Sequence, residues 1–252
     1  MRIRLVCILM IATLYLPEVS YSRTFGQMLC KSPGFFCLRV RGNESWQSLW
    51  PDDHERRLVM RINRMNTEIW GGMVIAVPNN LRASDDLMDY SPFPKQTTPP
   101  GEKLIIFDPR LHAFGAYDSS GILVRWGPAS GGSDWCRDLN SQCHTNVGKF
   151  RVFSLGDEDC KSKKFPLPKG GAPMPYCMYF NNGQAFHGEP NGLPGFNASH
   201  GCVRLYVSDA EWMRFDFIEG PTATNKYRGT RVIVNPYPEV ENSDNESSDG
   251  GD

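Results

Sequence analysis

Phe186-His187-Gly188, followed by Ala198-Ser199-His200-Gly201-Cys202-Val203-Arg204-Leu205, is the most informative part of this chain. It places a cysteine directly behind a glycine and close to two histidines, His187 and His200. A cysteine reacts as its thiolate, and an ordinary thiol with a pKa of about 8.5 is mostly protonated at neutral pH. A nearby imidazole corrects this by taking the proton or by stabilising the thiolate as an ion pair. The pattern therefore predicts that Cys202 is a nucleophile.

The residues around this segment favour a geometry suited to such chemistry. Asn182-Gly183 lies between two strand-like runs, a strong hairpin signal, and the hairpin would return His187 toward the turn before Cys202. Gly201 has no side chain, so its backbone can adopt an unusual conformation and direct the N–H groups of residues 201 and 202 at a developing oxyanion. The alternative interpretation, a buried or disulfide-bonded Cys202, stays open here.

The cysteine count favours a free Cys202. The chain has eight cysteines, many for a cytosolic protein and ordinary for an exported one. Cys7 falls in an expected leader, and the odd number that remains points to one free thiol. Six cysteines allow fifteen connectivities, and we prefer local closure. That preference gives the pairs Cys30–Cys37, Cys136–Cys143 and Cys160–Cys177. No CxxC pair is present, so we expect no metal site and no cofactor.

The two ends of the chain have distinctive compositions. Residues 1–22 combine two arginines, an apolar run at residues 5–16 and a polar stretch that ends in small residues, the order typical of a secretory signal peptide. The apolar run is too short to span a bilayer, and no later segment is long enough. We therefore expect an exported protein without a membrane span, located in the periplasm, with release outside the cell as the alternative. Residues 238–252 contain six acidic and no basic residues and predict a disordered tail.

Charge and patterning give the organisation between these ends. The formal net charge is −1. Without the expected leader and tail the rest of the chain is mildly basic. This charge is too small to indicate binding to nucleic acid, but it suits binding to an anionic polymer. Residues 38–79 predict a small βααβ unit, and the proline-rich residues 80–101 predict a semi-rigid linker. Residues 102–237 contain many short apolar runs between turn residues, which predicts a mainly β domain, sandwich-like or barrel-like.

The segment around Cys202 resembles the L,D-transpeptidase catalytic domain of the YkuD type, whose motif is a histidine, a spacer and then Ser/Thr-His-Gly-Cys. The resemblance extends over residues 103–234. It includes Thr145-Asn146-Val147-Gly148-Lys149-Phe150, which is similar to the family's Thr-Pro-x-Gly-x-Phe element, with Asn146 in place of the usual proline. It implies a β-sandwich-like catalytic domain.

The resemblance also implies a role for each residue of the motif. Cys202 would be the nucleophile, and His187 rather than His200 would be its base, oriented by the backbone carbonyl of Gly188. Ser199, His200 and Gly201 would shape the oxyanion turn. Arg204 would hold a carboxylate of the substrate bidentately, or would form a structural salt bridge instead. The insertions that carry Cys136, Cys143, Cys160 and Cys177 are not general in the family and would brace long loops over the cleft.

Residues 38–79 resemble a LysM module. Val40-Arg41-Gly42-Asn43-Glu44-Ser45-Trp46 is similar to its opening, Ile62-Asn63 to its middle, and Gly72-Met73-Val74-Ile75-Ala76-Val77-Pro78 to its close. LysM modules bind the N-acetylglucosamine of glycan strands, so the resemblance implies that this part binds glycan. The alternative is a small βααβ domain that merely packs on its neighbour.

Taken together, the two resemblances imply a peptidoglycan L,D-transpeptidase. It would form a cysteine acyl-enzyme on stem tetrapeptides, release D-alanine, and make three-to-three cross-links or attach another amine acceptor. Its partners would be stem peptides and glycan strands. The alternatives are an L,D-carboxypeptidase with the same site and a non-catalytic protein that binds cell walls or interacts with a host. The sequence does not indicate the oligomeric state.

Overall fold

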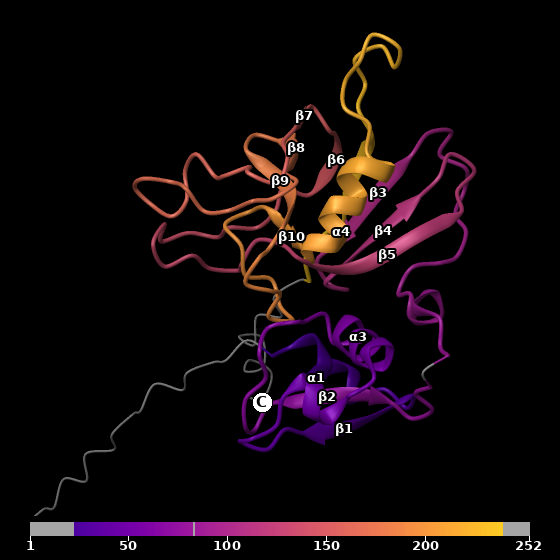
Figure 1. Ribbon diagram of the computed structural model, residues 1–252. Coiled ribbons are helices and arrows are strands. Elements are labelled where there is room, and N and C mark those ends of the chain that lie inside the picture. Colours follow the sequence, from indigo (N-terminus) through magenta and orange to yellow (C-terminus); the bar gives the residue numbers. More distant parts are fainter. Residues whose placement is uncertain (1–22, 83, 239–252) are drawn as a thin grey trace, which may run out of the picture.

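The computed structural model describes residues 23–82 and 84–238. A small N-terminal part and a larger sheet-rich part lie against each other (Figure 1). The expected signal peptide at residues 1–22 and all but the first residue of the expected acidic tail lie outside the described residues. Within residues 23–82 and 84–238, no helix is both long and apolar enough to cross a membrane.

The N-terminal part has the expected strand–helix–helix–strand order and one further helix before it. Its elements are α1 (Phe25–Leu29), β1 (Phe35–Arg39), α2 (Trp46–Leu49), α3 (Asp53–Ile62) and β2 (Val74–Pro78). β1 and β2 pair antiparallel. The carboxylate of Asp52 accepts a hydrogen bond from the N–H of Glu55 and so caps α3. Leu58, Val59 and Ile62 are the buried residues of α3, as the helical spacing of its apolar residues requires.

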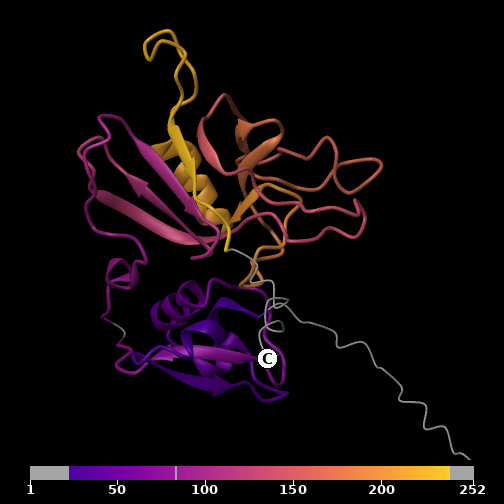
Figure 2. The ribbon, with the colours of Figure 1, turned by 180° about the vertical axis from the view of Figure 1, so that it is seen from behind.

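The larger part contains one continuous mixed sheet of nine strands among the described residues. The strands are β3 (Leu104–Asp108), β4 (Ala113–Tyr117), β5 (Leu123–Ser130), β6 (Gly148–Arg151), β7 (Ser154–Leu155), β8 (Met178–Asn181), β9 (Gln184–Gly188), β10 (Val203–Leu205) and β11 (Arg231–Val234). Their order in the sheet is β6-β11-β3-β4-β5-β10-β9-β8-β7. β9 and β10 pair in parallel, as do β3 and β11, which lie side by side in Figure 2.

The expected mainly β, sandwich-like or barrel-like domain takes the form of one curled sheet. β10 is hydrogen-bonded to β5 on one side and to β9 on the other, so the two halves of the sheet are joined rather than stacked as separate sheets. The sheet curls, and α4 (Val207–Trp212) with the π-helical turn η2 (Met213–Phe217) lies between its two halves (Figure 1). The domain is mainly β, as predicted.

The largest apolar core fills the space inside this curl. Ala210, Met213 and Phe217 of the helical segment are buried there among residues from both halves of the sheet. These residues include Ile105, Phe107, Phe114, Met178, Phe186, Val203 and Leu205. Since Phe186 neighbours His187 and Val203 neighbours Cys202, burial of both side chains fixes the strands beside the two predicted catalytic residues.

The proline-rich residues 80–101 do not form the semi-rigid spacer expected from their composition. Residues 87–97 of this segment pack on the outer face of β3, β4 and β5, with η1 (Leu87–Tyr90) and a buried Phe93 in that layer. The indole N–H of Trp126 donates to the carbonyl of Leu87 at 2.9 Å, and the hydroxyl of Tyr117 donates to the carbonyl of Pro94 at 2.9 Å. The outward-facing aromatic residues of the sheet need this cover, which the composition alone did not indicate.

Buried charges join the N-terminal part to the sheet. The carboxylate of Asp209, at the start of α4, is fully buried and accepts hydrogen bonds from Arg61 at 2.8 and 2.9 Å and from Arg125 at 2.9 Å. The guanidinium of Arg64 lies 4.6 Å from the ring centroids of both Phe25 and Trp126. Burial lowers the pKa of Arg64 to about 9. Such paired and stacked charges fix the two parts in one arrangement.

Candidate active site

Cys202 is the one free cysteine among the described residues. The three disulfides join Cys30 to Cys37, Cys136 to Cys143 and Cys160 to Cys177, which are the pairs predicted from local closure. Cys202 is half-buried and bonded to no other sulfur. The disulfide-bonded alternative that the sequence left open for Cys202 therefore does not apply to this structure.

The β8–β9 hairpin and the parallel β9–β10 pair bring the motif together. Asn182 and Gly183 have φ angles of 33° and 85°, as a two-residue turn of the predicted kind requires. In the β9–β10 ladder Arg204 lies opposite His187. Cys202 is two residues before Arg204, and side chains two apart along an extended chain share a face. Cys202, His187 and Arg204 accordingly line the same cavity.

This cavity has a volume of about 630 Å³. One wall comes from the loop that the Cys136–Cys143 disulfide closes, another from the segment between Cys160 and Cys177, and the floor from β8, β9 and the turn before β10. The lining includes Leu139, Gln142, His144, Lys163, Lys164, Phe165, Tyr179, Gln184, His187, Glu189, Ser199, His200, Cys202 and Arg204. Both disulfide-closed loops thus border the site, in line with the expectation that they brace the cleft.

His187 is buried and held in one orientation. Its Nδ1–H donates to the carbonyl of Gly188 at 2.8 Å, so Nε2 is left as the acceptor of a neutral ring. Burial lowers the pKa of His187 to about 4; Arg204 acts in the same direction, and the bond to Gly188 and the charge of Glu189 oppose it. The ring is therefore neutral at physiological pH and has a free lone pair.

The thiol of Cys202 is also neutral at rest. Burial raises its pKa, while a hydrogen bond from the backbone of Ala185 and the charge of Arg204 lower it. Its sulfur lies 3.7 Å from the carbonyl oxygen of Gly183, and no hydrogen bond joins it to His187 within the described part of the chain. The two groups are arranged as a thiol beside a neutral base, not as a thiolate–imidazolium pair.

The turn that carries Cys202 is closed by the hydroxyl of Ser199. This hydroxyl donates to the carbonyl of Cys202 at 2.5 Å and accepts from the N–H of Gly201 at 3.0 Å. Gly201 has a φ of 114°, and a Cβ there would lie 2.9 Å from Nε2 of Gln184, so only glycine fits. Because the N–H of Gly201 is engaged within the turn, it is not free to act as the oxyanion donor expected from the sequence.

Residues 102–234, about half of the chain, match the family of L,D-transpeptidase catalytic domains known as YkuD. The chain belongs to this family. The resemblance inferred from the motif is thereby confirmed for the catalytic domain. The match does not include residues 38–79, and the LysM-like interpretation of that segment stays a prediction.

Several solved L,D-transpeptidase structures are similar to this chain. The one from Xylanimonas cellulosilytica is 24% identical with a TM-score of 0.45, covering 59% of this chain and 66% of its own. That from Mycobacterium smegmatis is 23% identical with a TM-score of 0.41, covering 54% and 59%. That from Stackebrandtia nassauensis is 18% identical with a TM-score of 0.40, covering 53% and 55%. This chain therefore covers less than two thirds of each of them. No curated protein matches it.

Two ion pairs lie in the wall of the cavity, and the carboxylate partner of neither was predicted from the sequence. Nε of Arg204 lies 3.3 Å from a carboxylate oxygen of Glu189, so the salt bridge considered for Arg204 is present in this structure. Nε2–H of His200 donates to both carboxylate oxygens of Asp138 at 2.9 and 3.0 Å. A signal for the second pair did exist, because Asp138 stands between two cysteines that close a short loop over the site.

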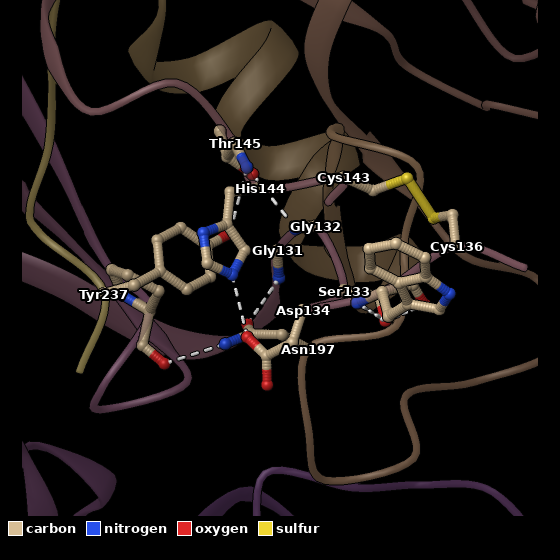
Figure 3. A network of polar contacts seen from close by, with 12 residues as sticks. Gly131, Gly132, Ser133, Asp134, Cys136, Cys143, His144, Thr145, Asn197 and Tyr237 are labelled. Carbon is tan, nitrogen blue, oxygen red and sulfur yellow. Dashed lines mark hydrogen bonds and ion pairs between the residues drawn. A yellow bond between two sulfur atoms is a disulfide. The ribbon is translucent and has the colours of Figure 1, made fainter. Parts of the chain in front are cut away.

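A polar network fixes the loop that leads to the first disulfide (Figure 3). The ring of His144 stacks on Tyr237 with centroids 3.8 Å apart, and its Nε2 lies 2.7 Å from Asp134. The hydroxyl of Tyr237 accepts from the N–H of Thr145 at 3.0 Å, and Gly131 donates to the side chain of Asn197 at 2.8 Å. The segment that follows β11 and the spacer before the motif both hold this wall of the site.

One group of side chains in the L,D-transpeptidase domain has the composition of a metal site. Candidate ligand atoms of Cys136, Asp138 and His200 lie within 4.8 Å of one another. The sulfur of Cys136 is bonded to Cys143, however, and a disulfide sulfur does not act as the thiolate ligand that zinc requires. Two ligands remain, and they already pair with each other.

The spacer between His187 and Ser199 contacts the N-terminal part of the chain. In Figures 1 and 2 this segment, in orange, reaches from the sheet to the indigo part. The N–H of Leu193 donates to the side chain of Asn66 at 2.7 Å, the N–H of Asn66 donates to the carbonyl of Leu193 at 3.0 Å, and that of Phe25 donates to the carbonyl of Gly195 at 2.7 Å. The loop that connects the two predicted catalytic residues therefore rests on residues outside the L,D-transpeptidase domain.

Proposed function

We propose that this protein is a peptidoglycan L,D-transpeptidase that works through an acyl-enzyme on Cys202. The observation that carries the proposal is the shared cavity of Cys202 and His187. The free thiol and a neutral imidazole border the same space, and the bond from Nδ1 to Gly188 leaves the other ring nitrogen as an acceptor. This is the arrangement that nucleophilic acyl transfer by a cysteine needs.

The proposed first step is attack of Cys202 on the carbonyl of the third residue of a stem tetrapeptide. Nε2 of His187 takes the thiol proton as the carbon–sulfur bond forms. The bond to the nitrogen of D-alanine then breaks, and the protonated imidazole returns the proton to the leaving amine. A thioester remains on Cys202, and D-alanine departs.

The proposed second step is attack of an amine on this thioester. A side-chain amine from a neighbouring stem attacks the carbonyl, His187 accepts its proton, and the sulfur leaves as a thiolate that takes the proton back. The product is a three-to-three cross-link, or an attachment to another molecule with a free amine. Both steps use the imidazole in its neutral form, which agrees with the lowered pKa of His187.

Charges at the cavity suit a substrate with several carboxylates. Lys163 and Lys164, from the segment between Cys160 and Cys177, line the cavity with Arg204, and Glu189 already pairs with Arg204. Stem peptides carry free carboxylates, so lysines at the rim would favour their approach. Arg204 would hold such a group only by exchanging its contact with Glu189.

We further propose that the enzyme works outside the cytoplasm and that residues 38–79 bind glycan. The three disulfides support export, because such bonds persist in oxidising compartments. The βααβ order of the N-terminal part supports the LysM-like interpretation. Retention of purified residues 23–252 on insoluble peptidoglycan, and its release by soluble glycan fragments, would test the second proposal.

The deciding experiment for the reaction is mass spectrometry of purified tetrapeptide muropeptides after incubation with residues 23–252. Loss of D-alanine with three-to-three dimers, absent from a Cys202→Ala control, would support the transpeptidase. Tripeptides alone, with the acyl-enzyme mass on the protein, would assign an L,D-carboxypeptidase instead. No product and no acyl-enzyme would refute the enzymatic proposal and favour a non-catalytic wall-binding protein.

A further inference from the structure

One ion pair joins a disulfide-closed loop to the motif that carries the proposed nucleophile. The imidazole of His200 donates to both oxygens of Asp138. Asp138 lies within the loop closed by the Cys136–Cys143 disulfide, and His200 stands two residues before Cys202. The reaction steps described above use neither side chain directly.

The second disulfide-closed loop reaches the same imidazole. The ring of Phe165, between Cys160 and Cys177, stacks on His200 with centroids 4.3 Å apart and an interplanar angle of 30°. One contact is charged and the other is a stacked face, so together they restrict both the tilt and the rotation of the ring. Each of the two disulfide loops thus contributes one contact to His200.

The backbone of the motif is held by different groups. The N–H groups of Ala198 and Ser199 donate to the carbonyl of Gly131 at 3.0 and 2.9 Å, and the N–H of Ser133 donates to the carbonyl of Ser199 at 2.9 Å. None of these bonds involves the imidazole of His200, whose side chain is 31% exposed. The orientation of that ring beside Cys202 therefore depends on Asp138 and Phe165.

We propose that Asp138 is a positioning residue for acyl transfer, because the Cys136–Cys143 loop holds its carboxylate against His200 and so keeps the imidazole as a fixed wall of the cavity beside Cys202. This inference rests on the proposed function. The hydrogen bond from His200 lowers the pKa of Asp138, so its carboxylate stays ionised at neutral pH. An ionised acceptor keeps the proton on Nε2 of His200 and so fixes its tautomer.

The main comparison is Asp138→Ala against Asp157→Ala. Asp157 is a matched control because its carboxylate also accepts a hydrogen bond from a side chain, Arg214, at 2.9 Å, close to the Cys160–Cys177 disulfide, while neither Asp157 nor Arg214 lines the cavity. We expect Asp138→Ala to lower kcat for D-alanine release by roughly 10- to 100-fold, because misplacing a group beside the reacting atoms slows chemistry more than binding. The KM of Asp138→Ala and the kcat of Asp157→Ala should both stay within about twofold of the values for the unchanged chain.

A double-mutant cycle tests whether Asp138 acts through His200. If it does, Asp138→Ala has almost no further effect on kcat in a His200→Ala chain, because the contact it supports is already lost. A Cys136→Ser/Cys143→Ser chain is expected to show a loss of kcat similar to that of Asp138→Ala, since the carboxylate is then no longer held in place. If the fold-losses in kcat of the Asp138→Ala and His200→Ala variants multiply in the double variant, the proposal is wrong.

The rate of Cys202 alkylation by iodoacetamide gives a readout that needs no substrate. With the ring of His200 released and a nearby anion removed, we expect faster alkylation in Asp138→Ala and an unchanged rate in Asp157→Ala. Equal alkylation rates and equal kcat values in the two variants would overturn the role of Asp138. Absence of D-alanine release from the unchanged chain would refute the proposed function, while the alkylation comparison would still decide whether Asp138 positions the site.

Discussion

The protonation state of Cys202 can be tested by replacing His187 with glutamine and following thiol alkylation against pH. Burial raises the pKa of Cys202 above that of an ordinary thiol, in spite of the opposing effects of Ala185 and Arg204. Burial lowers the pKa of His187 to about 4. Near pH 7 both groups are neutral, so the imidazole acts as a base only when the substrate is attacked.

The size of the effect follows from these values. Because burial raises the pKa of this thiol, a smaller fraction is ionised at pH 7 than the few per cent of an ordinary thiol, and the alkylation rate rises roughly tenfold for each pH unit up to at least about 8.5. His187→Gln removes a neutral ring and should leave this profile nearly unchanged. The same substitution should slow D-alanine release by about 100- to 10,000-fold, the usual contribution of a general acid–base group.

The assay is the rate of iodoacetamide labelling between pH 5 and about 9.5, followed by mass spectrometry on residues 23–252. Cys202→Ser should take up no label, because the other six cysteines of that range are in disulfides. A labelling rate that stays constant down to pH 5 would refute the reasoning. So would a profile that moves upward by a full pH unit in His187→Gln, because both results would mean a thiolate–imidazolium pair.

Three further predictions concern the parts that support the site. Asp209→Asn should lower the free energy of unfolding in urea by about 3–5 kcal/mol, since two guanidinium groups lose their buried anion; a loss under about 1 kcal/mol would contradict this. Asn66→Ala should speed deuterium exchange at the amide of Leu193, which donates to its side chain, and an unchanged rate would mean that the spacer is held by other contacts. Burial, assisted by the charge of Arg64, lowers the pKa of His112 from 6.5 to about 4. The folded state therefore resists protonation of His112. The free energy of unfolding is highest above pH 6.5 and falls by about 3 kcal/mol as the pH is lowered toward 4. His112→Asn, which suits the φ of 45° there, should flatten the dependence of Tm on pH, and an equal slope in both chains would argue against this role for His112.

Local signals in the sequence were sufficient to predict the residues at the centre of the site. The motif at Ser199-His200-Gly201-Cys202, the Asn182-Gly183 turn and the upstream His187 predict a hairpin, a nucleophile and a base from residues that are close in sequence. The disulfides were predictable for a similar reason, because each closes a short loop. The strand–helix–helix–strand order before the linker followed from the spacing of apolar residues.

Contacts between residues far apart in sequence were not predicted, even where one partner had a local signal, as Asp138 has between Cys136 and Cys143. Asp138 and His200 are 62 positions apart and Asp209 and Arg61 are 148 apart, and neither pair belongs to a periodic pattern. Alternation along a strand shows that one face is buried but not which strands pair, so the sequence did not show whether the two halves of the sheet are joined. Only the pairing of β10 with both β5 and β9 makes one curled sheet. Composition likewise showed prolines at residues 80–101 but not the aromatic surface that they cover.

The outer layer formed by residues 87–97 has a practical meaning for any attempt to shorten this protein. The recognised family region begins at residue 102, yet Trp126 and Tyr117 donate their polar hydrogens to carbonyls that come before it. A chain cut at that boundary would place an aromatic surface in water and leave the spacer behind the nucleophile without its support from Asn66. We therefore expect a piece limited to the family region to be less stable than the full chain, and an inactive short form would say nothing about glycan binding.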